Sequence, residues 1–213
     1  IIPVLQKTLH NKKPDCNAVT AGPGLSTALL VGVEVARTLS YAWKLPLIRT
    51  NHIEGHLYAN WLTAPSINYI KFPALVLIIS GGHTELVLMK NHGSYKLLGK
   101  TLDDAVGECF DKVGKMIGIA YPAGAVLSER AQKDKRNAIK FPRPMLEHQN
   151  YSFSFAGLKT AALYHLRDNP IKNPRALADF CASFEQAATD VLVGKTLRAA
   201  KEYTVKTVLI GGG

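Results

Sequence analysis

The chain has 213 residues, of which 47% are apolar and 20% charged, and its formal net charge is +10. This composition is typical of a globular protein and excludes low-complexity disorder, collagen and coiled coil. The apolar runs are too short to cross a bilayer, so we expect no membrane association. Three separated cysteines without a CxxC pair favour a reduced, cytoplasmic chain; they are Cys16, Cys109 and Cys181.

Both ends of the sequence are typical of a fragment. The chain begins at Ile1 without a Met, and it stops at Gly211-Gly212-Gly213 directly after the apolar run 208–210. We predict that this run is a buried strand, and glycines after such a strand usually open a tight turn or a ligand loop. We therefore expect a longer protein.

The first part of the chain, residues 1–65, alternates short apolar runs with helical patterns. Strands are predicted at 17–21 and 47–50, on either side of a helix at 26–44. A second helix is predicted to begin near Asn51, which is a good N-cap. This βαβα order favours an α/β fold with a mostly parallel sheet and helices on its faces.

A second lobe, residues 66–213, is predicted to follow a boundary near Ala64-Pro65-Ser66. The continuous apolar run 74–79 predicts a buried central strand. With strands at 85–90 and 95–99 it forms a β-meander. Four helices are then predicted, at residues 102–117, 122–132, 157–166 and 174–201.

Residues 130–145 carry half of the excess positive charge of the chain. They include one acidic side chain and six basic ones, namely Arg130, Lys133, Lys135, Arg136, Lys140 and Arg143. Such a surface attracts phosphate backbones, which favours a nucleic-acid partner. The alternative is a solvated loop that only keeps the protein soluble.

The segment Asn51-His52-Ile53-Glu54-Gly55-His56 contains a candidate metal site. On a helix, His52 and His56 lie one turn apart on the same face, so both imidazoles can converge on one ion. The zinc-protease pattern H-E-x-x-H requires Glu next to the first His. Here Glu54 lies two residues on, which disfavours a protease. Taken alone, such a pair is as often incidental as metal-binding.

The glycine turn Ser80-Gly81-Gly82-His83-Thr84 lies between two predicted strands. Glycines allow positive φ and close backbone approach, and successive amides can form a concave anion site. A plain hairpin turn is the simpler interpretation. The strand-to-helix turn at 22–24 has the same two interpretations.

Four acidic residues open the predicted helix at 102–117. For Asp103 and Asp104 we favour a simple interaction with the helix dipole. Asp111 lies deeper in the helix, where its carboxylate could accept a hydrogen bond from a ribose hydroxyl. The segment Tyr121-Pro122-Ala123-Gly124 marks the turn into the next helix.

Six segments, in this order, resemble the tRNA N6-adenosine threonylcarbamoyltransferase family, and specifically its bacterial branch. They are GPGL at 22–25, NHIEGH at 51–56, LIISGGHTEL at 77–86, LDDAVGECFDKVGK at 102–115, YPAG at 121–124 and FSFAGLKT at 153–160. The resemblance covers essentially the whole chain. It implies a two-lobed fold like that of actin, sugar kinases and Hsp70, with ribonuclease-H-like cores and a cleft between the lobes.

The same resemblance implies the site residues. His52 and His56 would ligate one divalent ion, with Fe²⁺ as first choice and Zn²⁺ as second. Threonylcarbamoyl-AMP would be held by one loop and two further contacts, that is by Ile78, Ile79, Ser80, Gly81, Gly82, Asp111 and Gly124. His83 is a candidate proton shuttle, although a purely structural histidine is an equal alternative.

The implied reaction is transfer of a threonylcarbamoyl group to N6 of adenosine 37 in tRNAs that read ANN codons. The implied partners are tRNA, a non-catalytic paralogue and a P-loop ATPase. The family's opening strands would precede Ile1, and a binding Asn and a metal-binding Asp would follow Gly213. Ala123 and Ala156 stand where the family usually has Gly and Ser.

Two other classes are consistent with parts of the pattern. A sugar-kinase-like ATPase of the same superfamily would use an Asp base and Mg²⁺ rather than a His pair. A non-catalytic homologue that serves as a docking partner would typically lack His52 and His56.

Overall fold

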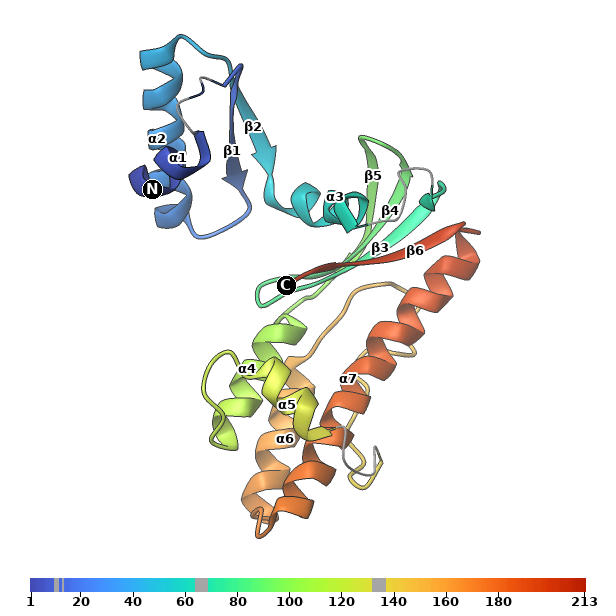
Figure 1. The fold of residues 1–213 in the computed structure, drawn as a ribbon. Coiled ribbons are helices and arrows are strands. Elements are labelled where there is room, and N and C mark those ends of the chain that lie inside the picture. The colour runs from blue at the N-terminus through green and yellow to red at the C-terminus, as the bar shows by residue number, and fades with distance from the viewer. Residues whose placement is uncertain (10–11, 13, 64–68, 132–136) are drawn as a thin grey trace. The chain divides into compact units, whose positions relative to one another are not determined.

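The computed structural model describes residues 1–9, 12, 14–63, 69–131 and 137–213 (Figure 1). The chain divides into two compact units, Ile1–Ala59 and Asn60–Gly213, which we call unit 1 and unit 2. The boundary predicted at Ala64-Pro65-Ser66 lies outside the described residues. Within the described residues, no helix is both long and apolar enough to span a membrane.

Unit 1 is a βαβ arrangement with flanking helices. Its elements are α1 (Ile2–Leu9), β1 (Asn17–Gly22), α2 (Ser26–Trp43), β2 (Leu47–Asn51) and most of α3 (His52–Thr63). The two strands pair in parallel, with Asn17 opposite Leu47, and α2 connects them. The parallel pair predicted from the sequence is therefore confirmed.

Local signals set the ends of these elements. The turn into α2 contains Gly22 at φ +149° and Gly24 at φ +156°, backbone conformations that residues with a Cβ rarely adopt. Lys44 ends α2 in the left-handed region. The Asn51 side chain accepts hydrogen bonds from the amides of Ile53 at 2.8 Å and Glu54 at 3.4 Å, so the N-cap predicted for α3 is confirmed.

The sequence patterns did not predict α1. This helix has only eight residues, none of them buried. Pro3 stands in its first turn, where the missing amide hydrogen costs little because that amide has no partner within a helix.

Unit 2 is built on a four-stranded sheet in the order β5-β4-β3-β6. Its strands are β3 (Ala74–Ile79), β4 (Thr84–Asn91), β5 (Ser94–Lys100) and β6 (Thr207–Gly212). The first three form the predicted antiparallel meander, and β6 pairs in parallel with β3. A meander whose first strand takes a parallel fourth strand is the strand order of a ribonuclease-H-like core.

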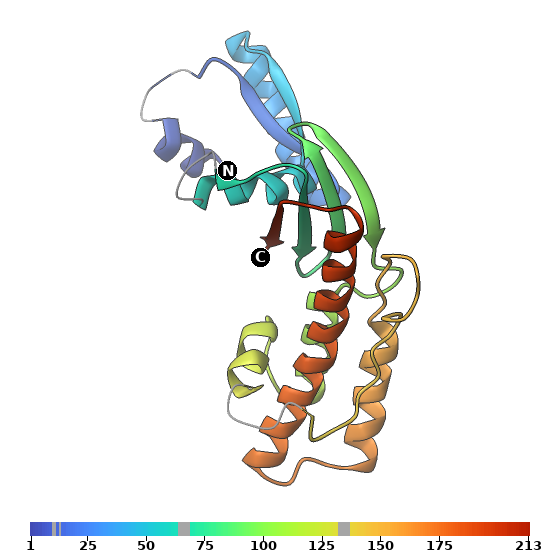
Figure 2. The ribbon, with the colours of Figure 1, turned by 90° about the vertical axis from the view of Figure 1, so that its right-hand side faces the viewer.

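Four helices lie on one side of this sheet (Figures 1 and 2). They are α4 (Val106–Met116), α5 (Gly124–Ala131), α6 (Ala156–Asp168) and α7 (Pro174–Glu202). Asn173 caps α7 by accepting from the Ala176 amide at 2.8 Å, and Pro174 occupies the first turn as predicted. The stripe of α7 contributes Phe180, Cys181, Phe184, Ala188 and Val191 to one core that also includes Leu75 and Leu77 of β3.

Two sequence predictions about unit 2 are wrong. The helix expected from residue 102 begins only at Val106, because residues 101–105 are used in contacts with a distant segment. The strand at 208–210 is not buried, since Val208 is 45% and Ile210 68% exposed. Among the described strands β6 pairs only with its sheet neighbour β3, and Val208 and Ile210 lie on the same, exposed face of β6.

Candidate functional site

The predicted glycine turn joins β3 to β4 and is closed by its own serine. The Ser80 amide donates to the His83 carbonyl at 2.9 Å, and the His83 amide donates to Ser80 Oγ at 3.0 Å. Ile78 is fully buried and Ile79 partly buried, so the strand before the turn is fixed in the core. The turn therefore extends from a rigid element.

The N-terminus of α4 packs directly against this turn. Thr84 is fully buried, and its Oγ1 accepts the Val106 amide at 2.9 Å. A Cβ placed on Gly107 would lie 2.5 Å from the Ser80 carbonyl oxygen and 2.9 Å from Gly81 Cα. Any larger residue at position 107 would push the helix away from the turn. We did not predict roles for Gly107 or Thr84, because each depends on a contact between elements.

Three backbone amides near this junction have no hydrogen-bond partner among the described residues. Within the described residues, no hydrogen bond uses the amides of Gly81, Gly82 or Gly107. Gly107 is in the first turn of α4, where amides have no partner within the helix and the helix dipole is positive. Unpaired amides on a turn next to a helix N-terminus form an anion-binding site.

The reason that we gave for glycine at positions 81 and 82 needs correction. Neither residue has a positive φ, and an added Cβ on either one would meet nothing within 4 Å. The hydrogen bonds of Ser80 close the turn without the left-handed conformation. What glycine provides here is open space above the backbone.

A second glycine segment lies beside the first. In the parallel register of β3 and β6, Ile78 is opposite Gly211 and Ile79 opposite Gly212. Gly212 has φ +131°, and a Cβ on it would lie 1.7 Å from the Ile79 carbonyl oxygen. The carboxyl ends of both parallel strands thus meet at the anion-binding junction, as is common for ligand sites in open α/β sheets.

Asp111 is on α4 and faces the start of α5. Its Oδ1 accepts the Ala123 amide at 2.7 Å, immediately before Gly124, the first residue of α5. Beside it is a surface pocket of about 430 Å³. Lining residues are Asp111, Lys112, Lys115, Ile119, Ala120 and Tyr121. The carboxylate therefore fixes the α4–α5 turn and also borders open space in which a ligand could bind.

Ala123 is fully buried. It packs on Gly114 of α4, where an added Cβ would lie 2.2 Å from the Ala123 Cβ. The absence of a side chain at position 114 leaves the room for this methyl group, so the turn geometry tolerates the alanine.

Asp103 and Asp104 both contact the distant helix α6. Asp103 Oδ1 accepts the amides of Phe155 at 2.8 Å and Ala156 at 3.2 Å, at the start of α6. Asp104 forms ion pairs with Lys112 at 2.8 Å and Lys159 at 2.5 Å. For Asp103 the predicted interaction with the dipole of its own helix is wrong, because its carboxylate caps α6 instead, whereas Asp104 contacts both α4, through Lys112, and α6, through Lys159.

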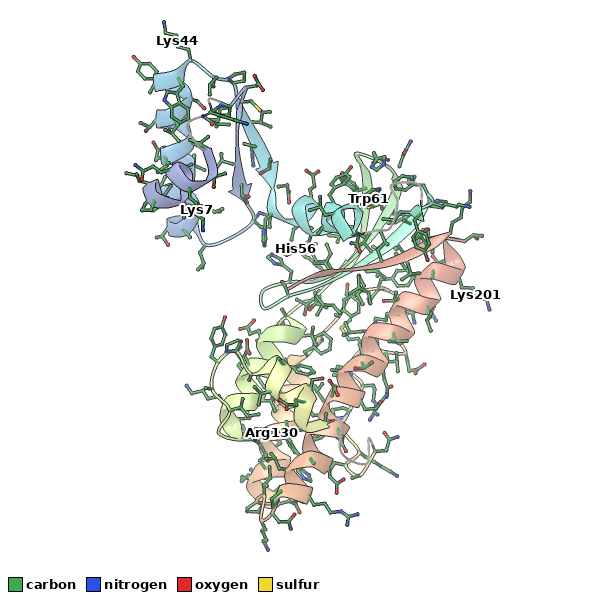
Figure 3. The ribbon with its side chains drawn as sticks, viewed as in Figure 1. Lys7, Lys44, His56, Trp61, Arg130 and Lys201 are labelled. Carbon is green, nitrogen blue, oxygen red and sulfur yellow. The ribbon has the colours of Figure 1, made fainter. Side chains whose placement is uncertain are left out.

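The histidine pair is in unit 1, on α3. Nε2 of His52 and Nε2 of His56 are 3.2 Å apart, and both side chains are partly buried (His56 is labelled in Figure 3). Two nitrogens that bind one ion at about 2.0–2.1 Å in tetrahedral geometry are separated by roughly this distance. The pair therefore fits a shared metal ion. The described residues contain no group of three or more potential ligands.

The basic stretch is described only in part. Lys133, Lys135 and Arg136 lie outside the described residues, whereas Arg130 is on α5 (Figure 3). Arg143 is paired with Asp190 through Nε at 2.9 Å and Nη2 at 2.8 Å. This distant carboxylate neutralises one of the six charges counted from the sequence.

Comparisons with known proteins agree on one family. The family model described as tRNA N6-adenosine threonylcarbamoyltransferase matches residues 1–213. Curated relatives with that name come from Bacillus subtilis (51% identity over 93% of this chain), Endomicrobium trichonymphae (47% over 97%) and Thermomicrobium roseum (43% over 100%). The chain spans 56%, 59% and 66% of their respective lengths.

Among solved structures, an activator of 2-hydroxyisocaproyl-CoA dehydratase from Clostridium difficile gives a TM-score of 0.44 at 16% identity, covering 90% of this chain and 68% of that chain. That likeness is too distant to support an argument. The family match, with the strand order of unit 2, confirms the actin-like α/β fold class predicted from the sequence. The chain belongs to the tRNA N6-adenosine threonylcarbamoyltransferase family.

Proposed function

We propose that the complete protein transfers the threonylcarbamoyl group of threonylcarbamoyl-AMP to N6 of adenosine 37 in tRNAs that read ANN codons. The observation that carries this proposal is the family match over every residue of the chain. A site with the required chemistry supports it, because the unpaired amides in the turn after β3 and at the N-terminus of α4 suit a phosphate group.

The adenylate is proposed to bind at the junction of the turn and α4. Ile78 and Ile79 fix the turn, and Ser80 closes it. The amides of Gly81 and Gly82 then hold the phosphate. Asp111 lines a surface pocket, where its carboxylate is proposed to accept a ribose hydroxyl through the oxygen that Ala123 does not use, and Gly124 at the start of α5 is proposed as a further contact.

In the transfer, N6 of adenosine attacks the carbamoyl carbonyl carbon, the bond from this carbon to the phosphate oxygen breaks, and AMP leaves. N6 loses one proton. Amides that already hold the phosphate stabilise the negative charge on AMP as it departs. His83, whose backbone closes the turn, is the candidate for receiving the proton.

His52 and His56 are proposed to hold one divalent ion, Fe²⁺ or Zn²⁺. When bound, such an ion supplies Lewis-acid stabilisation of developing negative charge. Elemental analysis of the complete protein should show metal in the wild type and its loss in His52→Ala. His148→Ala, which changes an exposed histidine elsewhere, should retain the metal. Equal metal content in His52→Ala and the wild type would contradict this assignment.

We further propose a cytoplasmic enzyme that binds tRNA and works with a non-catalytic paralogue and a P-loop ATPase. The net charge of +10 supports a polyanionic substrate. Reversing Lys135 and Arg136 to Glu should flatten the dependence of tRNA affinity on log salt. Reversal of Lys201 on α7 is the control (Figure 3). An unchanged slope would leave the basic stretch a role in solubility only.

Gly82→Val is the sharpest test of the proposed site. Because its Cβ has open space and φ is not positive, this variant should fold normally and interfere only with a ligand. It should abolish tRNA modification and the binding of a non-hydrolysable threonylcarbamoyl-AMP analogue, with unchanged metal content. Gly93→Ala, which strains the β4–β5 turn because φ is +71° there, is the control for a loss of stability away from the site. Wild-type affinity in Gly82→Val would place the ligand elsewhere.

Asp111→Asn tests the second contact. The amide oxygen can still accept from Ala123, so the α4–α5 turn is retained while the charged acceptor is lost. We expect the analogue to bind about 1.5–3 kcal/mol more weakly.

The family match does not favour the sugar-kinase-like alternative, which would instead show ATP hydrolysis that persists after removal of transition metal.

A further inference from the structure

The segment FSFAGLKT at 153–160 contributes to the resemblance, but it has no role in the site described so far. It lies beside Lys100, the last residue of β5. The Phe153 amide donates to the Lys100 carbonyl at 3.0 Å, and the Leu102 amide donates to the Phe153 carbonyl at 2.9 Å. Phe153 and Phe155 are fully buried. The segment is therefore held against the chain that leads into α4.

Asp103 links the segment that precedes α4 to the first turn of α6. Its Oδ1 accepts the amides of Phe155 and Ala156, and its Oδ2 accepts the Ser154 hydroxyl at 2.5 Å. The carboxylate thus caps α6 from a position about 50 residues earlier in the sequence. The approach to α4 and the start of α6 are joined by a cap that is not local.

Asp104 adds a charged link one turn further along α6. Its Oδ2 pairs with Lys159 Nζ at 2.5 Å, and its side chain is only 13% exposed. Burial by itself would raise the pKa of Asp104, but hydrogen bonds from Lys112 and Lys159 outweigh it and hold the pKa below its usual value. The carboxylate is therefore ionised at neutral pH, and the link is charged.

The two lysines differ in what they connect. Lys112 is on α4 and also pairs with Glu108 of the same helix at 2.7 Å. Lys159 is on α6, so its pair with Asp104 connects two elements. Both lysines bind the same carboxylate. Arg167, at the C-terminal end of α6, pairs with Asp168 at 2.7 Å and its side chain is 66% exposed, so Arg167→Gln removes one positive charge and one ion pair, as Lys159→Gln does.

A displacement of Asp104 would also move the residues that contact the glycine turn, because they follow Asp104 within three positions. Val106 is bonded to Thr84, and Gly107 leaves no spare room against Ser80. We propose that the Asp104–Lys159 ion pair positions the N-terminus of α4 against the Ser80–Gly82 turn and so sets the geometry of the adenylate site. Lys159 is a positioning residue, and this role rests on the proposed function of that turn.

The experiment compares Lys159→Gln, Lys159→Arg and the control Arg167→Gln in the complete protein. The first readout is the affinity for the non-hydrolysable threonylcarbamoyl-AMP analogue, with KM and kcat for tRNA modification. Lys159→Gln should weaken binding about tenfold or more, because misplacement of a site by a fraction of an ångström is costly. KM should rise more than kcat falls. Lys159→Arg should restore most of the affinity, and Arg167→Gln should change it less than about threefold.

The second readout is hydrogen exchange at the backbone amides of residues 80–84 and 105–109. It should increase in Lys159→Gln and not in Arg167→Gln. This measurement needs no ligand, so it tests whether Lys159 positions the N-terminus of α4 even if the wild type does not bind the analogue. Failure of the wild type to bind the analogue would overturn the proposed function and not this inference. If Lys159→Gln does not fold, Lys159→Met, which keeps the aliphatic stem, replaces it.

Equal losses in Lys159→Gln and Arg167→Gln would show that Lys159 acts only through its charge or through general stability, and would overturn the inference. Unchanged exchange at residues 80–84 in Lys159→Gln would overturn it as well.

Discussion

Unit 1 and unit 2 differ in how much apolar surface their elements bury. Among the described residues of unit 1, only Ser40 and Leu57 are buried, and Leu47 and Ile48 of β2 are 41% and 47% exposed. In unit 2 a single core joins the sheet to four helices. Unit 1 therefore depends on local signals such as turn glycines and caps, whereas tertiary packing maintains unit 2.

The candidate site residues follow the same division. The histidine pair in unit 1 is spaced by its own helix, and its geometry follows from the i, i+4 relation alone. The glycine turn in unit 2 is shaped by α4, β6 and, further away, α6. Sequence spacing suffices for the first kind of site, and the second kind requires the packed structure.

Thiol reactivity should show the largest difference between the units. Cys16 of unit 1 is exposed, whereas Cys109 and Cys181 of unit 2 are buried. Burial raises the pKa of Cys109 to about 12 and that of Cys181 to about 11. In the native protein, iodoacetamide should modify Cys16 at least about a thousandfold faster than the other two, which react through unfolding. Peptide mass spectrometry with a urea-unfolded control gives the rates. Similar rates at Cys16 and Cys181 would contradict the closed core of unit 2.

Truncating a core aromatic of unit 2 should have the next largest effect. Phe184 is fully buried, with its ring centroid 5.1 Å from that of Phe110. Phe184→Ala should lower the free energy of unfolding by about 3–5 kcal/mol. Leu39→Ala in unit 1, where Leu39 lines the partly open contact of α1 with α2, should cost about 1 kcal/mol. Urea denaturation measures both, and equal costs would contradict the difference between the two units.

Replacing a buried lysine should stabilise unit 2. Lys195 is fully buried and donates to the Asn150 carbonyl at 2.9 Å, and no ion pair of the described residues includes it. Burial, together with the nearby Arg198 charge, lowers the pKa of Lys195 to about 8. Lys195→Met should therefore raise the free energy of unfolding at pH 7 by up to about 3 kcal/mol. Arg198 continues to satisfy the Asn150 carbonyl at 2.8 Å.

The pH dependence gives the sign of this effect. Between about pH 8 and 10.5 the unfolded chain binds more protons at this lysine than the folded one does, so wild-type stability should gain from this group as pH rises through that window. The gain should be absent in Lys195→Met. Lys201→Met, an exposed substitution on the same helix, is the control (Figure 3). A stability loss at pH 7 in Lys195→Met would mean that the hydrogen bond outweighs the burial of charge.

Surface ion pairs should have the smallest effect. In unit 1, Arg37 and Glu34 pair at 2.8 Å with side chains 63% and 52% exposed. Glu34→Gln should change the free energy of unfolding by less than about 0.5 kcal/mol. Asp190→Asn in unit 2 should cost about 1 kcal/mol, because Asp190 binds both Arg143 and Gln186. Thermal melts at low and high salt measure both effects, and a larger loss for Glu34→Gln would reverse the expected order.

Much of the molecule follows from the sequence alone. The apolar run of β3, the Asn51 cap and Pro174 at the start of α7 each predict an element from residues within a few positions of one another. The order of six motifs likewise indicates the family, and the family model confirms it. These signals are local or consecutive, so they can be read before the chain folds.

Other features were decided only by the tertiary structure. Asp103 caps a helix that begins about 50 residues later, Gly107 is required by the Ser80 carbonyl, and Val208 and Ile210 are exposed despite their apolar character. Hydrogen bonds from Ser80, and not positive φ, determine the glycine turn. Each depends on which atoms meet across elements, and a one-dimensional pattern carries no information about such distances until packing has brought the segments together.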